Sequence, residues 1–146
     1  MKKLNDYEVA IIGPGLSNDT WSKSIFFDLA DLVSSGSIST KLVVDAGLLP
    51  LLSRNPFKYH NWVLTPHEGE ASTLLNRSQT WIMNNRIEAA YLLQEKYSGT
   101  VVLKGPNTVI FDGNELFVCS HGGHYMGVAG MGDVLTGVIG SIMHLT

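Results

Sequence analysis

The chain has 146 residues, a formal net charge of −3 and no run of basic residues, which argues against a nucleic-acid-binding surface. Hydrophobic residues make up 45% and charged residues 16%, a composition typical of one globular domain and not of a disordered chain. No stretch approaches the ~18 consecutive apolar residues of a membrane span, no secretory signal follows Met1, and the one cysteine, Cys119, cannot form an internal disulfide. We therefore expect a cytoplasmic protein with no nucleic-acid or membrane partner.

Segments typical of strands and of helices alternate along the chain. Short β-branched runs predict strands, and amphipathic runs bounded by capping or turn residues predict helices. The expected strands are 7–12, 41–46, 61–65 and 100–104, followed by a hairpin over 108–120 that turns at Asp112-Gly113-Asn114. The expected helices are 20–34, a short one over 47–53, one that begins near Pro66, 83–98, and a last one from near Gly132 to the C-terminus.

Three of these helices are specified further. Thr20 can cap the first of them. The residues expected to face the core are Ile25, Leu29 and Leu32 in the helix 20–34, and Ile87, Ala90, Leu93 and Tyr97 in the helix 83–98. The last helix is apolar nearly all round, which predicts a buried helix whose N-terminus opens into the interior or a cleft.

The order of elements predicts an α/β fold with a ligand site at one edge of its sheet. Continuous apolar strands separated by helices indicate a mostly parallel sheet with helices on both faces. Ligands bind such sheets at the carboxyl ends of the strands. The residues that follow the expected strands at this edge are Gly13-Pro14-Gly15, Asp45, His67 with Glu70, and Lys104-Gly105.

The stretch GMGDVLTGVIG, residues 130–140, predicts a phosphate site. Gly130 and Gly132 lack Cβ atoms, so the backbone there can approach a ligand closely. The helix that follows presents unpaired N–H groups and the positive end of its dipole, which suit an anion. Asp133 beside them is either a helix cap or a general base for a hydroxyl that attacks phosphorus.

Each remaining candidate also has two interpretations. Lys104 is either a solvated strand end or a point charge for a nucleotide phosphate. His67 with Glu70 is either a capping arrangement or part of a site, and since no third ligand has diagnostic spacing, no protein metal site is predicted. Asp45 is either an ordinary acid in a strand-to-helix turn or a contact for Mg²⁺-bound water.

Five blocks resemble the ADP/ATP-dependent NAD(P)H-hydrate dehydratases of the ribokinase-like superfamily, in order and in rough spacing. The blocks are IIGPGL (11–16), VVDAG (43–47), LTPHEGE (64–70), VVLKGPNTVI (101–110) and MGVAGMGDVLTGVIG (126–140). The resemblance runs from about residue 7 to the end of the chain. The LTPHEGE and GMGDVLTG blocks are the more specific ones.

The resemblance implies repair of a damaged cofactor. Members of the family dehydrate the S-epimer of NAD(P)H hydrate and restore NAD(P)H at the expense of a nucleotide, by phosphorylating the hydroxyl and then releasing phosphate. By similarity, Asp133 is catalytic, and it contacts the substrate together with Gly15 and His67. The nucleotide, ADP or ATP with Mg²⁺, would contact Lys104, Gly105, Pro106, Asn107, Thr108, Gly130 and Gly132. ADP is the nucleotide expected for a bacterial member.

The chain departs from the family pattern at Gly47, where a second acid is usual, at Ala129, where glycine is usual, and in length. Family domains are longer, so residues 1–146 are expected to be the C-terminal portion of such a domain, incomplete at its N-terminus. A sheet without its early strands exposes an edge and an apolar face, which predicts a homo-oligomer or a partner segment. A small-molecule kinase of the same superfamily and a non-catalytic nucleotide-binding remnant remain alternatives.

Overall fold

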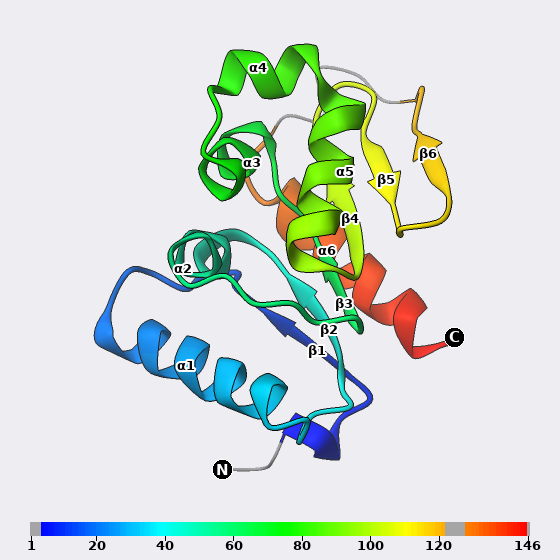
Figure 1. The fold of residues 1–146 in the computed structure, drawn as a ribbon. Helices are drawn as coiled ribbons and strands as arrows, with labels where there is room; N and C mark the ends of the chain where they lie inside the picture. Colours follow the sequence, from blue (N-terminus) through cyan, green and yellow to red (C-terminus); the bar gives the residue numbers. More distant parts are fainter. Residues whose placement is uncertain (1–3, 122–127, 146) are drawn as a thin grey trace.

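The computed structural model describes residues 4–121 and 128–145. In this part of the chain one sheet runs in the order β1-β2-β3-β4-β5-β6, with β1 to β4 parallel and the last two strands antiparallel (Figure 1). The strands are β1 (Val9–Ile12), β2 (Lys41–Val44), β3 (Trp62–Leu64), β4 (Thr100–Leu103), β5 (Val109–Phe111) and β6 (Leu116–Val118). The predicted mostly parallel sheet and the hairpin are confirmed.

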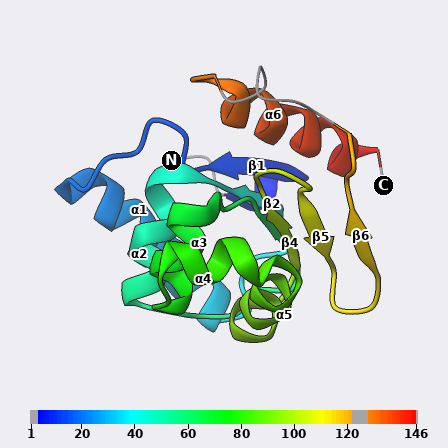
Figure 2. The same ribbon diagram turned by 90° about the horizontal axis from the view of Figure 1, so that it is seen from above.

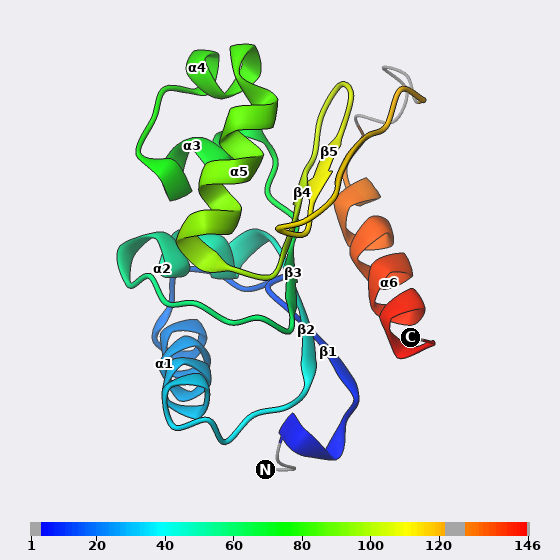
Figure 3. The same ribbon diagram turned by 45° about the vertical axis from the view of Figure 1, so that its right-hand side comes forward.

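The helices cover the two faces of the sheet unequally. They are α1 (Thr20–Ser34), α2 (Leu49–Arg54), α3 (Glu68–Leu75), α4 (Gln79–Asn84), α5 (Arg86–Tyr97) and α6 (Met131–His144), with short 3₁₀ turns η1 (Leu4–Asp6) and η2 (Ala46–Leu48). Each parallel strand is added on the same side of the one before it, so right-handed crossovers place α1, α2, α3 and α5 on one face. The helix α6 follows the β5–β6 hairpin and lies on the opposite face, against β1 and β2 (Figures 2 and 3).

The main core lies between the sheet and the four helices on its covered face. Its largest fully buried side chains include Trp62, Tyr97 and Phe26, joined by leucines from the strands and from α1, α2, α3 and α5. The polar tips of the two largest are satisfied, because Trp62 Nε1 donates to the Ser98 carbonyl at 3.0 Å and Tyr97 Oη donates to the Leu74 carbonyl at 3.1 Å. Burial raises the pKa of Tyr97 to about 12.

The prediction that α6 is buried all round is wrong. One side of the helix packs on the sheet, where a Cβ at Gly140 would lie 3.0 Å from Ile11 Cδ1. The other side exposes Val134, Val138 and Ile142, at 60%, 50% and 56% of their surface. The strand order explains this, since every crossover helix lies on the far face and no second helix of residues 4–121 or 128–145 covers α6. None of the described helices combines the length and hydrophobicity needed to cross a bilayer.

The cap of α1 differs from the prediction, whereas the start of α3 agrees with it. Asp19, and not Thr20, caps α1, because its Oδ1 accepts the Ser22 N–H at 2.7 Å. The helix after β3 begins at Glu68, with His67 as its N-cap, directly after Pro66.

The predicted helix 83–98 is two helices that meet at Asn85. The backbone of Asn85, at φ −131° and ψ 44°, lies outside the helical region and ends α4 before α5 begins. Ile87 then faces outward with 47% exposure, and Ala89 joins the buried side of α5. In α1, similarly, the most buried apolar residues are Phe26 and Leu29, while the predicted Ile25 and Leu32 lie at the margin.

Gly13 and Gly15 follow β1, and a side chain at each would have a different cost: a steric clash together with backbone strain at Gly13, and backbone strain alone at Gly15. Both have positive φ, +127° at Gly13 and +73° at Gly15, but a Cβ at Gly13 would lie 1.7 Å from the Asp45 carbonyl oxygen, whereas nothing lies within 4 Å at Gly15. We expect Gly13→Ala to lower the free energy of unfolding by more than about 3 kcal/mol or to prevent folding, and Gly15→Ala to cost only about 1 kcal/mol. Urea denaturation measures both values, and equal losses would contradict this packing.

Candidate functional site

The N-terminus of α6 meets the carboxyl ends of the parallel strands. At one end of the helix, Lys41 Nζ, at the start of β2, donates to the Met143 carbonyl at 3.0 Å. At the other end, the Thr136 hydroxyl reaches Asp45, which directly follows β2. The helix therefore runs antiparallel to β2, and this places the turn at Gly130 and Gly132 on the edge where the sequence predicts ligands to bind.

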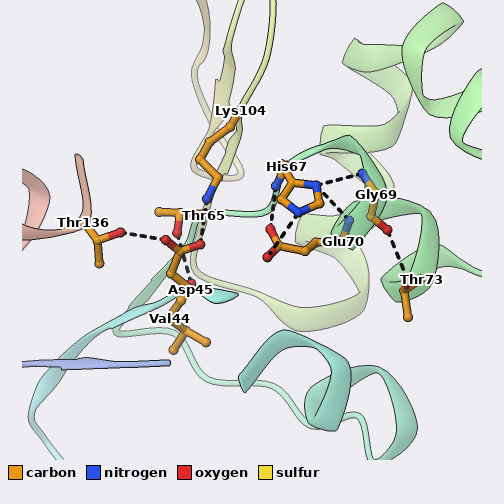
Figure 4. A network of polar contacts seen from close by, with 9 residues as sticks. All are labelled: Val44, Asp45, Thr65, His67, Gly69, Glu70, Thr73, Lys104 and Thr136. Carbon is orange, nitrogen blue, oxygen red and sulfur yellow. Dashed lines mark hydrogen bonds and ion pairs between the residues drawn. The ribbon is translucent and has the colours of Figure 1, made fainter. Parts of the chain in front are cut away.

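Asp45 is the centre of the polar contacts at this edge (Figure 4). Its Oδ1 accepts from Lys104 Nζ at 2.7 Å, and its Oδ2 accepts from Thr136 Oγ1 at 2.9 Å. Burial raises the pKa of Asp45, but the hydrogen bond and charge of Lys104, with the Thr136 hydroxyl and the Ala46 amide, bring its pKa below the ordinary value. The carboxylate is therefore ionised at neutral pH, and with both oxygens engaged a structural role is favoured over a contact for Mg²⁺-bound water.

The glycine turn before α6 has open space beside it. Gly130 is the N-cap with φ +88°; among residues 4–121 and 128–145, no atom lies within 4 Å of a Cβ added there and no side-chain hydrogen bond caps this end of the helix. A Cβ at Gly132 would lie 3.5 Å from Lys104 Nζ and 3.6 Å from Asp45 Oδ2. The structure thus brings two residues of the predicted nucleotide set, Lys104 and Gly132, next to each other at a helix end suited to an anion.

Asp133 lies in the first turn of α6 and is exposed. No hydrogen bond from a described backbone N–H to its carboxylate is present, so of its two interpretations capping is not observed among these residues. Within the described ranges the carboxylate forms no hydrogen bond or ion pair with another side chain. A carboxylate in this position remains available as a proton acceptor for a bound hydroxyl.

His67 caps α3. Its Nδ1 accepts the N–H groups of Gly69 at 3.0 Å and Glu70 at 3.3 Å, and Glu70 Oε2 accepts the His67 N–H at 2.8 Å (Figure 4). Because Nδ1 accepts these bonds, the proton of the neutral ring resides on Nε2, which lies 3.5 Å from Glu70 Oε1. The capping interpretation is therefore confirmed, and the ring, 60% exposed, is held in one orientation at the ligand edge.

The loop from Lys104 to Thr108 is closed on itself and tied to the turn before α3. Thr108 Oγ1 donates to the Gly105 carbonyl at 3.1 Å, while the Lys104 N–H donates to the Pro66 carbonyl at 2.8 Å. Asn107 adopts the left-handed region at φ +54°, and its side chain lines an open groove of about 540 Å³ with residues of α4, α5 and β6. Pro106 is exposed on the outside of this loop.

The backbone after β1 closes over the start of η2. A Cβ at Gly47 would lie 2.1 Å from the Leu16 carbonyl oxygen, so the second acid that is usual in the family does not fit at this position without a change in the backbone. Gly15 lies exposed in the same segment. Across residues 4–121 and 128–145, no described contact joins Gly15 to His67 or Asp133.

Three polar residues at this edge were not predicted. Thr136 follows Asp133 by three residues and faces the sheet; Glu68 lies inside the LTPHEGE block; Arg86 begins α5. The first two could have been found from helix periodicity and from the motif, whereas Arg86 has no sequence signal beyond its place at a helix start. Among the residues with described positions, no three His, Cys, Asp or Glu side chains converge as metal ligands.

Replacing Asp45 tests its central position. Asp45→Asn leaves Lys104, 18% exposed, without its anionic partner, and we expect a loss of about 3 kcal/mol in the free energy of unfolding at neutral pH. The pKa of Asp45 is lowered in the fold, so this stabilisation is fully present above the unfolded-state pKa of about 4 and is lost as the pH falls below it. Denaturant unfolding of the wild type and of Asp45→Asn should be measured from about pH 7 to about pH 3. The difference between their free energies of unfolding should become smaller only at the acid end of this range.

The exposed pair of Glu8 and His144 provides the control. Its side chains are 73% and 63% exposed, so Glu8→Gln should change stability by less than about 1 kcal/mol. An Asp45→Asn protein as stable as wild type at neutral pH would contradict the central role of Asp45.

The comparisons with known proteins agree with this geometry. The family model described as NAD(P)H-hydrate dehydratase matches residues 1–146. The bifunctional NAD(P)H-hydrate repair enzyme Nnr of Coxiella burnetii is 40% identical over 136 residues, which cover 92% of this chain and 27% of that protein. The chain thus spans about a quarter of the length of this relative.

Two solved structures share the fold. A ribokinase-like superfamily protein of Enterococcus faecalis superposes with a TM-score of 0.78 at 27% identity, over 94% of this chain and 47% of its own. The second is the ADP/ATP-dependent NAD(P)H-hydrate dehydratase of Bacillus subtilis, co-crystallised with ATP and Mg²⁺. It superposes with a TM-score of 0.76 at 26% identity, over 97% of this chain and 51% of its own. The fold is therefore ribokinase-like, and the chain belongs to the NAD(P)H-hydrate dehydratase family.

Proposed function

We propose that the chain carries the nucleotide-binding and catalytic part of an ADP- or ATP-dependent (S)-NAD(P)H-hydrate dehydratase, which restores NAD(P)H. The observation that supports this most directly is the glycine turn before α6, which has Lys104 beside Gly132 and Asp133 in the first turn, with no described side chain bonded to that carboxylate. The family match and the likeness to an ATP-bound relative point in the same direction.

The nucleotide phosphates would lie against the backbone amides at Gly130 and Gly132, since no atom of the described residues fills the space beside Gly130. Lys104 Nζ, held by Asp45, supplies a fixed positive charge next to this position. Mg²⁺ bound with the nucleotide would offset phosphate charge. The loop from Gly105 to Thr108 would contact the rest of the nucleotide, for which we propose ADP as the preferred form.

Asp133 would act on the hydroxyl of the hydrate. It accepts the hydroxyl proton while the oxygen bonds to the terminal phosphorus of the nucleotide, whose bridging oxygen leaves. The ring C–O bond then breaks with loss of phosphate and of a neighbouring ring proton, and the double bond re-forms. The helix-end amides stabilise the charge that develops on the transferring group. Gly15 and His67 would contact the nicotinamide nucleotide from the same edge.

Asp133→Asn tests the catalytic role. The neutral amide keeps the shape of the side chain but cannot take the hydroxyl proton, so we expect a loss of about 10²- to 10⁴-fold in kcat with little change in nucleotide affinity. The assay incubates the chain with hydrated NADH, Mg²⁺ and ADP or ATP and follows recovery of the reduced-nicotinamide absorbance.

Asp28→Asn, at an exposed position of α1, is the matched control and should retain wild-type activity. Full activity in Asp133→Asn would overturn the assignment of the base. Nucleotide binding without recovery in the wild type would indicate the non-catalytic alternative, and phosphorylation of another alcohol would indicate a kinase.

We also propose that the outer face of α6 is covered in the working protein, by a second copy or by a partner segment. Val134, Val138 and Ile142 form a ridge at four-residue spacing on this face, and each exposes at least half of its surface. The neighbouring strand β1 pairs only with β2 within the described sheet, and its Ile11 is 44% exposed. Relatives about twice as long in their solved structures have additional chain that could cover such a surface.

Val138→Glu tests this surface. A charge at the middle of the ridge should abolish association, because a buried carboxylate without a partner is strongly disfavoured. Sedimentation velocity at tens of micromolar should show oligomers for the wild type and monomers for the variant. Met83→Glu, which changes another half-exposed apolar residue on α4, should associate as wild type does. A monomeric wild-type chain would contradict cover by a second copy and leave the partner segment as the occupant.

A further inference from the structure

Arg86 joins the loop after β4 to the turn before α3. Its Nη1 donates to Glu68 Oε1 at 2.6 Å, and its Nη2 donates to the carbonyls of Leu103 at 2.8 Å and Lys104 at 3.1 Å. The two charged side chains are mostly buried, with 13% and 19% of their surface exposed. One guanidinium therefore holds the end of β4 and the first residue of α3 at the same time.

The loop lies directly against this ion pair. A Cβ at Gly105 would come within 2.8 Å of both Arg86 Nη1 and Glu68 Oε1, so the backbone at Gly105 is in close contact with the two charges. The Lys104 N–H also donates to the Pro66 carbonyl at 2.8 Å. Two independent links thus connect the loop that begins at Lys104 to the turn that carries His67.

The position of Arg86 is unfavourable for its own helix. It is the first residue of α5, and a positive charge in the first turn opposes the helix dipole. Its contacts outside α5 offset this cost. A lysine could keep the ion pair with Glu68, but its single ammonium cannot reproduce the planar fork that reaches three acceptors.

We propose that Arg86 is a positioning residue that fixes the loop from Lys104 to Thr108 against the turn of His67, and that nucleotide affinity depends on this link. The inference rests on the proposed nucleotide role of that loop. Arg86 bonds to the carbonyl oxygens of Leu103 and Lys104, so it acts through the backbone that presents Lys104 and Gly105.

Nucleotide binding gives the first test. Arg86→Lys keeps the charge and the pairing with Glu68, so the variant should still fold cooperatively, with a midpoint of thermal unfolding lowered by the loss of two hydrogen bonds. The bonds to the Leu103 and Lys104 carbonyls are lost, and we expect the Kd for Mg-ADP and Mg-ATP, measured by calorimetry, to rise about tenfold or more. Arg77→Lys is the matched control, because Arg77 stacks on Trp81 away from the loop, and it should bind as wild type does. A wild-type Kd in Arg86→Lys would overturn the proposal.

Amide exchange in the nucleotide-free chain gives a second test that does not depend on nucleotide binding. In Arg86→Lys the Lys104 amide should exchange about tenfold faster, because its bond to Pro66 is less well held. The exchange rate of the Leu42 amide near the start of β2, which donates to the Asn61 carbonyl at 2.8 Å, should be unchanged. Unchanged exchange at Lys104 would overturn the positioning role, even alongside weaker binding, since that combination would indicate direct contact with the nucleotide. A wild-type chain that binds no nucleotide would instead contradict the proposed function, and the exchange of Lys104 would still decide the role of Arg86.

Discussion

The charged carboxylate of Asp45 connects three segments that are distant in sequence, since β2 leads into it, Lys104 reaches it from the end of β4, and Thr136 reaches it from α6. Its backbone is equally constrained, because the carbonyl of Asp45 lies where a Cβ of Gly13 would be. A buried ion pair contributes little net stability, but it is costly to break and it fixes geometry. The spacing between Gly132, Lys104 and the strand ends follows from this one group.

The same group accounts for how α6 is held. Among the described elements, α6 is the one helix on its face of the sheet, and it exposes an apolar ridge, so the packing described constrains it on one side. Polar bonds near both ends supplement this packing, from Thr136 to Asp45 and from Lys41 to the Met143 carbonyl. The glycine turn at the start of α6 is therefore placed by electrostatics and hydrogen bonds as much as by hydrophobic burial.

A second charged pair acts at the neighbouring strand end. Asp45 and Lys104 join β2 to β4, while Arg86 and Glu68 join the end of β4 to α3. Both pairs are mostly buried. Asp133 and the imidazole of His67 at the same edge are more exposed.

The sequence by itself determined the strands, the hairpin, the mostly parallel sheet and the family, because these depend on local periodicity, turn residues and short motifs. It also indicated the ligand edge, since polar residues follow each parallel strand. Helix starts were predicted less accurately from the sequence, as Asp19 and Asn85 show, because capping depends on competition between neighbouring side chains. The roles of Gly15, His67 and Asp133 toward a substrate stay predictions.

Only the tertiary structure decided which charges pair. Asp45 meets Lys104 across 59 residues and Thr136 across 91, and Arg86 meets Glu68 across 18, and no local pattern encodes such distances. The exposure of Val134, Val138 and Ile142 could not be predicted from the sequence either. An apolar helix has the same sequence pattern whether one or both of its sides are covered. What covers a helix depends on the order of strands in the sheet, and that order is a property of the whole fold.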